Sequence, residues 1–249
     1  MKKVGFLGFG KIARAIYEEM MREQLGHPCF IQDLKAENLP QDVPYLSGYE
    51  ENVYREADLI IEGATAPVLK EQIGHILSNA DLMMFSVTAF ADDEFLRQAF
   101  SLAEKYGHHI YLPHGAILGL DGIMDGSAIW TNVHITTTKN PASLGRTDIE
   151  KTVLYDGPTR GACGAYPRNV NVHAAVALLG IGFDETHSTI IADPEVHTNA
   201  HVIVLSGPGI EMELHVTSTS TGGVTGSYTP LSAQGSLKRI LGKDILRIV

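Results

Sequence analysis

A glycine turn close to the N-terminus is the feature that most constrains the fold. The apolar run Lys3–Leu7 leads straight into Gly8-Phe9-Gly10-Lys11-Ile12-Ala13, and a helical pattern continues to Gln24. Glycines at these spacings allow a tight turn and a close approach of backbone to a pyrophosphate, and a small residue at Ala13 lets the helix pack against the sheet. The helix N-terminus then presents N–H groups to phosphates. The turn therefore predicts a dinucleotide-binding unit whose cofactor contacts include Gly8, Gly10, Lys11 and Ile12.

An acidic residue stands at the expected distance from this turn. Asp33 follows the apolar stretch Cys29-Phe30-Ile31-Gln32. An acid about 20 residues beyond the glycines binds the ribose hydroxyls of NAD. A carboxylate there would repel the 2′-phosphate of NADP, whereas the neighbouring Lys35 would soften that preference, so use of both cofactors stays open. The alternative for the whole segment is an ordinary strand–turn–helix unit without a nucleotide.

Strands and helices alternate through residues 1–113. Apolar runs at 59–64, 82–87 and 109–112 predict strands, and helical patterns open near Pro67 and Asp92. Continuous apolar strands separated by helices indicate a parallel sheet covered on both faces. Ligands of such sheets bind beyond the carboxyl ends of the strands. We therefore expect Ala64, Thr65 and Ala89 to line one crevice with the glycine turn and Asp33.

The pattern changes after about His114. Residues 133–136, 196–205 and 210–216 alternate with period two, which indicates an antiparallel or mixed sheet with one covered face. A helix near 170–180 is apolar on nearly every side. We expect an α/β protein: a Rossmann-type doubly wound parallel sheet in residues 1–113 and an α+β catalytic and dimerisation domain with a mixed sheet in 114–230. The C-terminal helix, about 231–249, is expected to pack back on the first domain.

Composition narrows the classes of function. The chain has 249 residues, of which 44% are hydrophobic and 19% charged, as in ordinary globular proteins. A formal charge of −10 argues against nucleic acid as a partner. The chain has two cysteines, Cys29 and Cys163, from which we expect no disulfide framework, and this fits a reducing cytoplasm. No apolar run approaches the roughly 18 residues of a membrane span, so we expect no membrane partner.

One histidine is informative among the eleven. Period two places His197, Asn199 and His201 on one face of a predicted strand, opposite a face of valine and alanine. Such a strand either floors a polar pocket or faces solvent, and the pattern leaves both open. His197 and His201 lie four residues apart, roughly 13 Å along a strand, which is too far for one metal ion. We expect no metal site.

Two further segments could bind ligands. Tyr166–Asn171 precedes the apolar helix, so the helix start and the Arg168 guanidinium could hold a carboxylate. The alternative is a helix start with asparagine caps and a surface arginine. The small residues in His114–Asp121 would allow close approach to a nicotinamide, or build a tight crossover.

Taken together, these segments resemble the L-aspartate dehydrogenase family, and the similarity is spread over most of the chain. The stretches that carry it are Gly8–Ala13, Ala89–Asp92, Gly115–Asp121, Thr137–Asn140, Pro167–Asn171, Ala192–Pro194 and Asn199–Ile203. One stretch departs from the family pattern: the chain reads Thr225-Gly226-Ser227-Tyr228-Thr229-Pro230 where an N-P-x-[ST]-S-like turn is usual. This difference affects the expected shape of the local loop and the closure of the pocket, but not the expected chemistry.

The resemblance implies reversible oxidation of L-aspartate by NAD or NADP to 2-iminosuccinate. The imine hydrolyses to oxaloacetate and ammonia, or feeds NAD biosynthesis. The resemblance also implies a homodimer, a catalytic role for His201, and cofactor contacts from Ala116 and Asn171.

The chemistry requires a base, because the substrate amine must be neutral when hydride leaves the α-carbon. Histidine, with an ordinary pKa near ~6.5, suits this role, and His201 would act either on the amine or on the water that hydrolyses the imine. Asn199 would orient the substrate or His201. Arg168 is the first candidate to hold a substrate carboxylate, and Lys139 is the second.

Other classes remain open. Another Rossmann amino-acid or imine dehydrogenase, such as a homoserine dehydrogenase-like or dihydrodipicolinate reductase-like protein, would share the glycine turn. A non-catalytic NAD(H)-sensing protein would bind the cofactor without turnover. A DNA-binding redox repressor fits the acidic charge less well.

Overall fold

The computed structural model describes residues 1–219 and 226–242. The chain divides into two compact units, Met1–Pro113 with Pro230–Val249, and His114–Thr229. The C-terminal part of the expected last helix, 243–249, and positions 220–225, which include Thr225 of the atypical loop, lie outside the described residues.

The first unit contains a six-stranded sheet in which every pairing is parallel, in the order β3-β2-β1-β4-β5-β6. This order confirms the expected Rossmann-type sheet, and it reverses direction between β1 and β4, where such folds bind their ligands. The elements of this unit are β1 (Lys2–Leu7), α1 (Lys11–Arg22), β2 (Gly26–Gln32), β3 (Tyr45–Leu46), α2 (Glu51–Tyr54), β4 (Leu59–Glu62), α3 (Ala66–Leu77), β5 (Asp81–Met84), η1 (Val87–Ala91), α4 (Asp93–Tyr106), β6 (Ile110–Tyr111) and α8 (Tyr228–Leu241).

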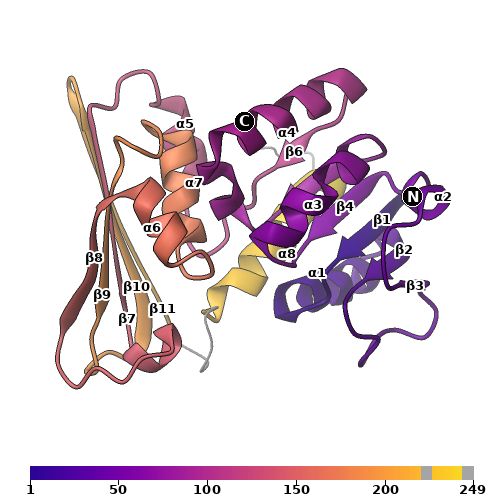
Figure 1. Ribbon diagram of the computed structural model, residues 1–249, viewed down its shortest axis with the longest axis horizontal. Helices are drawn as coiled ribbons and strands as arrows, with labels where there is room; N and C mark the ends of the chain where they lie inside the picture. The colour runs from indigo at the N-terminus through magenta and orange to yellow at the C-terminus, as the bar shows by residue number, and fades with distance from the viewer. Residues whose placement is uncertain (220–225, 243–249) are drawn as a thin grey trace. The chain divides into compact units, whose positions relative to one another are not determined.

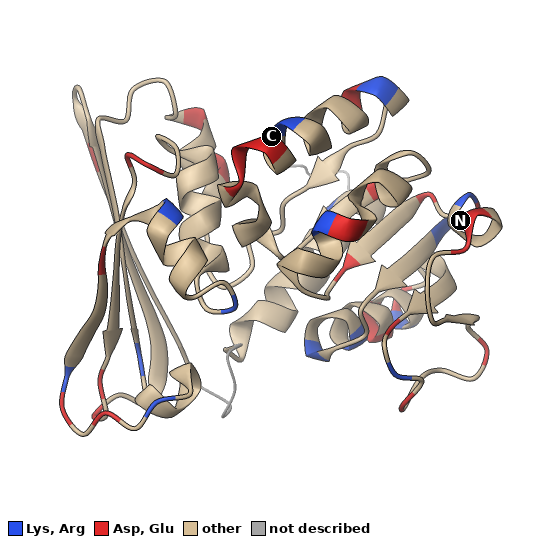
Figure 2. Cartoon of the chain, in the orientation of Figure 1, with Lys and Arg blue, Asp and Glu red and all other residues tan. Residues whose placement is uncertain are grey.

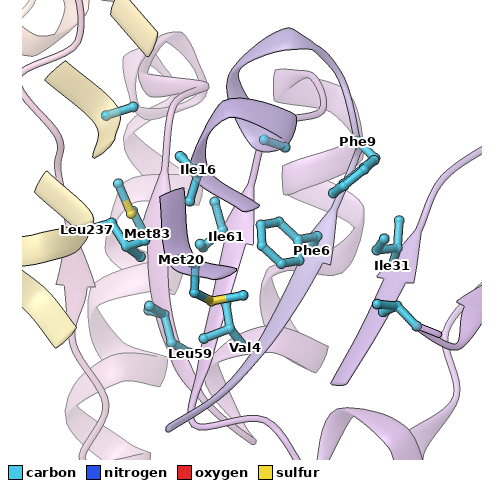
Figure 3. Packing of buried hydrophobic residues seen from close by; sticks show 13 residues of the cluster. Val4, Phe6, Phe9, Ile16, Met20, Ile31, Leu59, Ile61, Met83 and Leu237 are labelled. Carbon is cyan, nitrogen blue, oxygen red and sulfur yellow. The ribbon is translucent and has the colours of Figure 1, made fainter. Parts of the chain in front are cut away.

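The core of this unit joins the N-terminal strand to the C-terminal helix. Phe6, Ile61 and Met83, from three neighbouring strands, are fully buried with side chains of α1 and with Leu237 of α8 (Figure 3). Complete burial of a side chain of this size contributes about 1.5–3 kcal/mol. Polar contacts also hold α8 on α1: Gln234 Nε2 donates to the Ala15 carbonyl at 2.9 Å, and Lys238 Nζ lies 2.6 Å from a carboxylate oxygen of Glu19.

The second unit is built on a five-stranded mixed sheet in the order β11-β10-β7-β9-β8, in which β7 and β9 are parallel and the other pairs antiparallel. Figure 1 shows α5, α6 and α7 on one face of this sheet. The mixed sheet was expected, but β8 and β9 were not predicted. The elements are α5 (Leu120–Asp125), β7 (Asn132–Lys139), η2 (Pro141–Leu144), β8 (Thr152–Pro158), α6 (Thr159–Ala165), α7 (Asn171–Leu179), β9 (His187–Ala192), β10 (Thr198–Gly207) and β11 (Ile210–Thr219).

In the described part of the chain, no helix is both long and apolar enough to cross a membrane.

Candidate active site

The glycine turn of the first unit lies at the carboxyl end of β1. Gly8 has φ +81°, and a Cβ added to it would lie 2.8 Å from backbone atoms of Ala64, so this position requires glycine twice over. Gly10 is different: a Cβ there would meet no described atom within 4 Å. The backbone at Gly10 therefore borders open space at the N-terminus of α1, as the binding of a pyrophosphate requires.

Asp33 is tied to the same turn. Its Oδ2 atom accepts a hydrogen bond from the Phe9 backbone N–H at 2.7 Å, and its Oδ1 atom accepts one from Lys35 N at 3.3 Å. The carboxylate is half-buried, whereas the Lys35 side chain is exposed and lies 3.9 Å from a carboxylate oxygen of Glu37. A carboxylate fixed on the glycine turn is suited to bind ribose hydroxyls.

The other expected cofactor residues of the first unit lie at the carboxyl ends of its strands. Lys11 and Ile12 open α1, and Ala64 follows β4. Thr65 is the N-cap position of α3 without a side-chain cap hydrogen bond, and Ala89 is buried in η1. Ala116 and Asn171 belong to the second unit, where both are half-buried and Asn171 is the first residue of α7.

Sequence reasoning missed a buried carboxylate at the carboxyl end of β4. Glu62, the last residue of β4, is fully buried and accepts hydrogen bonds from Ala64 N, Phe85 N, Ser86 N and Ser86 Oγ at 2.7–3.0 Å. Burial raises the pKa of Glu62, and these four donors act in the opposite direction. Because the carboxylate captures the N–H groups of Phe85 and Ser86, β5 ends at Met84 rather than at the predicted Val87.

In the second unit, Asn199 and His201 lie on the covered face of β10. Burial alternates along this strand, and each of the two side chains is 3% exposed. The solvent-facing alternative for the strand is therefore wrong, although His197, which precedes β10, is exposed. The neighbouring strand β7 contributes Thr137, paired with His201, and Lys139 to the same buried face.

Lys139 makes this buried face electropositive. Its side chain is 3% exposed, and no described carboxylate forms an ion pair with it. Figure 2 shows the middle parts of the strands in this sheet mostly free of charged residues, and α7 carries none. Burial lowers the pKa of Lys139 to about 8, while burial together with the charge of Lys139 lowers the pKa of His201 to about 3. An anionic ligand would offset this uncompensated charge.

The ring of His201 is held by one of its two nitrogens. Its Nδ1 atom lies 2.8 Å from Thr137 Oγ1, which lies 2.6 Å from Nε2 of His173 on α7. His173 is fully buried, and this burial lowers its pKa well below the usual value. No hydrogen bond from a described residue engages the Nε2 atom of His201, so this atom is available to a ligand. Thr137 and His173 were not predicted, although a histidine in an otherwise apolar helix was a usable signal.

Two of the remaining candidates differ in exposure. Oδ1 of the buried Asn199 has no hydrogen-bond partner among the described residues, so it can accept a hydrogen bond from a ligand. Arg168 is exposed ahead of α7, and the N-cap position of that helix is Val170, not an asparagine. Lys139 rather than Arg168 thus shares a buried face with His201.

The opposite face of the same sheet holds a second polar cluster. Ligand atoms of His134, Asp156 and His187 lie within 4.8 Å of one another. His187 Nε2 lies 2.9 Å from Asp156 Oδ1, and Thr189 Oγ1 bridges His134 and Asp156 at 2.9 and 2.7 Å. Hydrogen bonds thus link all three side chains, with Asp156 and Thr189 as the shared partners.

The parallel sheet with its glycine turn and the buried histidine face define a pyridine-nucleotide-dependent oxidoreductase of two units. Residues 8–113 match the NAD-binding domain of homoserine dehydrogenase, and residues 123–240 match the C-terminal domain of aspartate dehydrogenase.

Relatives that align over nearly the whole chain identify its family. L-aspartate dehydrogenase of Methanosarcina acetivorans is 34% identical over 257 aligned positions, covering 95% of this chain and 94% of that protein. The enzyme of Nitrosopumilus maritimus is 32% identical, with 98% of each chain covered. The crystal structure of aspartate dehydrogenase from Thermotoga maritima superimposes with a TM-score of 0.81 at 27% identity, covering 100% of this chain and 99% of that one. The chain belongs to the L-aspartate dehydrogenase family.

Proposed function

We propose that the chain catalyses the NAD(P)-dependent oxidation of L-aspartate to 2-iminosuccinate, which water converts to oxaloacetate and ammonia, and the reverse reaction. The observation that carries the proposal is the buried face of β7 and β10. Among the described residues, it combines a base, the one buried cation of the unit and an amide acceptor without a partner: His201, Lys139 and Asn199.

Each of these residues has a place in the chemistry. Lys139 pairs with a substrate carboxylate, which offsets the cost of burying its charge. Asn199 Oδ1 accepts a hydrogen bond from the substrate amine, and Arg168 is our candidate for the second carboxylate. His201 Nε2 takes a proton from the ammonium group, so that nitrogen can form the C=N bond as hydride leaves the α-carbon. The bound anion counters the charge of Lys139 and raises the pKa of His201 from its resting value of about 3.

The first unit fits the cofactor by its open backbone at Gly10 and its anchored carboxylate at Asp33. Bound NAD would supply the hydride acceptor. We propose that Gly8, Gly10, Lys11, Ile12, Ala64, Thr65 and Ala89 surround its phosphates and that Asp33 holds its adenosine ribose. Ala116 and Asn171 are proposed as further cofactor contacts.

We further propose a cytoplasmic homodimer. The cysteines Cys29 and Cys163 are free thiols, as expected in a reducing compartment. The face of the second sheet opposite α5, α6 and α7 carries half-buried valines of β10, Val202 and Val204, and a partner subunit would cover them. Light scattering after size exclusion should give twice the mass of the chain, and Val204→Glu should give monomers.

The test is the absorbance of reduced nicotinamide with L-aspartate and NAD or NADP. Homoserine, L-glutamate and D-aspartate serve as controls. We expect turnover with L-aspartate, lowered roughly 10²- to 10⁴-fold in His201→Ala but not in His197→Ala, which alters an exposed histidine. Turnover with homoserine in place of L-aspartate would overturn the substrate assignment. Cofactor binding without turnover in either direction would favour an NAD(H)-sensing protein.

A further inference from the structure

Five buried side chains form a continuous hydrogen-bonded series behind His201. From His201 Nδ1 the series runs to Thr137 Oγ1 at 2.8 Å, and from there to His173 Nε2 at 2.6 Å. His173 Nδ1 lies 2.9 Å from Ser188 Oγ, which lies 2.7 Å from Thr159 Oγ1. None of the five is more than 3% exposed. The members come from five elements: β10, β7, α7, β9 and α6.

The series ends on a group that can only accept. Thr159 Oγ1 lies 3.0 Å from the backbone carbonyl of Thr186, and a carbonyl has no hydrogen to give. The single hydroxyl hydrogen of Thr159 is therefore used on this carbonyl. Thr159 must then accept from Ser188, which has one hydroxyl hydrogen too. Ser188 consequently accepts from His173 Nδ1.

Assigning one hydrogen to each group in the same way leads from His173 to His201. A neutral imidazole carries one N–H, and when His173 holds it on Nδ1, its Nε2 atom is an acceptor. Thr137 then donates to His173 and accepts from His201 Nδ1. Complete burial keeps His173 neutral, since its pKa lies well below the usual value.

We propose that the Thr186 carbonyl sets the direction of this whole series and thereby fixes His201 as the Nδ1–H tautomer, with the lone pair on Nε2. Thr137, His173, Ser188 and Thr159 are positioning residues that keep Nε2 ready to accept a proton. The tautomer stands independently of the reaction, whereas its catalytic consequence rests on the proposed oxidation of L-aspartate.

Removing the last hydroxyl of the series should reverse its direction. In Thr159→Val, Ser188 loses the acceptor for its hydrogen and keeps His173 Nδ1 as its described partner. A buried hydroxyl without an acceptor is costly enough to bias the two directions roughly tenfold or more. Ser188 should turn to donate to His173, and both histidines should change to the Nε2–H tautomer. The Thr159 backbone N–H still donates to the Thr186 carbonyl at 2.9 Å, so the carbonyl keeps a partner.

The experiment is nitrogen-15 NMR of the full-length chain labelled at histidine, because the nitrogen shifts distinguish the two neutral tautomers. We expect Nδ1–H at both His201 and His173 in the wild type and in Thr159→Ser, and Nε2–H at both in Thr159→Val. Thr136→Val, on the outward face of β7, is the matched control and should leave both tautomers unchanged. An Nε2–H signal from His201 in the wild type would overturn the proposal without any variant.

Kinetics supply the second readout. Thr159→Val should lower kcat about tenfold with little change in the KM for L-aspartate, and Thr159→Ser should restore kcat. An unchanged kcat in a Thr159→Val variant with reversed tautomers would remove the positioning role. A wild type that shows the predicted tautomers but does not oxidise L-aspartate would overturn the proposed function and leave the tautomer assignment standing.

Discussion

Lys139 and His201 lie on the same buried face of two neighbouring strands, and the charge of Lys139 adds to burial in lowering the pKa of His201. Two cationic groups close together in a low dielectric repel each other, so the face is poised for an anion. This relationship makes Lys139 the residue whose replacement should most directly affect substrate binding.

Lys139→Met should raise the KM for L-aspartate at least roughly tenfold, because it leaves a substrate carboxylate in the site without its cation. The KM for NAD should stay the same. Steady-state kinetics with each substrate varied in turn would measure both. Lys151→Met is the control, since the Lys151 side chain is 63% exposed in the same unit. An unchanged KM for L-aspartate would show that Lys139 does not bind a substrate carboxylate, and Arg168 would then be the candidate for this contact.

The pH profile should carry the signature of Lys139. Its pKa of about 8 means that the free enzyme holds the ammonium below that pH and loses it above. A plot of kcat/KM for L-aspartate should therefore fall on the alkaline side with an apparent pKa near 8, since kcat/KM reports groups of the free enzyme. Lys139→Arg should move this limb to higher pH, because a guanidinium stays protonated. The same limb at the same pH in Lys139→Arg would exclude Lys139 as its source.

Acid should destabilise the second unit through its buried histidines. His201 binds a proton near pH 6.5 in the unfolded chain but only near 3 in the folded one. Between these values the unfolded state holds more protons, so the free energy of unfolding decreases as pH falls through this range. A difference of one pKa unit between the two states is worth about 1.4 kcal/mol. Urea titrations at several pH values would give the free energy of unfolding at each pH. In this range that free energy should change less steeply with pH in His201→Asn than in the wild type, and equal dependence on pH in the two proteins would contradict the prediction.

Much of the first unit could be predicted because its signals are local. Gly8 and Gly10 lie within one turn, and Asp33 follows at a spacing that the strand–helix–strand geometry dictates. The end of β5 was the exception. The strand pattern continued to Val87, but the Glu62 carboxylate, 23 residues away from Phe85, captures the N–H groups that would have extended the ladder.

The second unit was predicted in outline only. The period of two placed Asn199 and His201 on one face of the strand. It could not say which face the helices cover, because alternation divides the residues of β10 into two sets and does not show which set is buried. The partners of His201 were beyond sequence reasoning: Thr137 lies 64 residues from it along the chain, and His173 lies 36 residues from Thr137. Such contacts are made by packing between elements, which no local periodicity records.

Cofactor preference should respond to the charge of Asp33. In Asp33→Asn a side-chain oxygen can still accept from the Phe9 N–H, but the negative charge that repels a 2′-phosphate is removed. The ratio of kcat/KM for NAD to that for NADP should fall at least roughly tenfold, as for other single charged contacts. Asp42→Asn, an exposed acid on the chain that follows β2, should leave the ratio unchanged. An unchanged ratio in Asp33→Asn would place the discrimination elsewhere.

The two glycines of the turn should fail in different ways when each is replaced by alanine. At Gly8 the positive φ and the 2.8 Å approach to the Ala64 backbone strain the folded chain, so Gly8→Ala should lower the free energy of unfolding by about 1–3 kcal/mol. Gly10 has φ −77° and ψ −167°, which alanine adopts freely, and its Cβ would enter open space. Gly10→Ala should therefore keep the stability of the wild type while weakening NAD binding, because the methyl group occupies the room that a pyrophosphate needs.

Thermal unfolding with and without NAD separates the two effects. Gly8→Ala should unfold at a lower temperature than the wild type in both conditions, and Gly10→Ala should lose only the stabilisation that NAD provides. A Gly10→Ala protein that NAD stabilises as well as the wild type would show that the phosphates do not lie against this backbone.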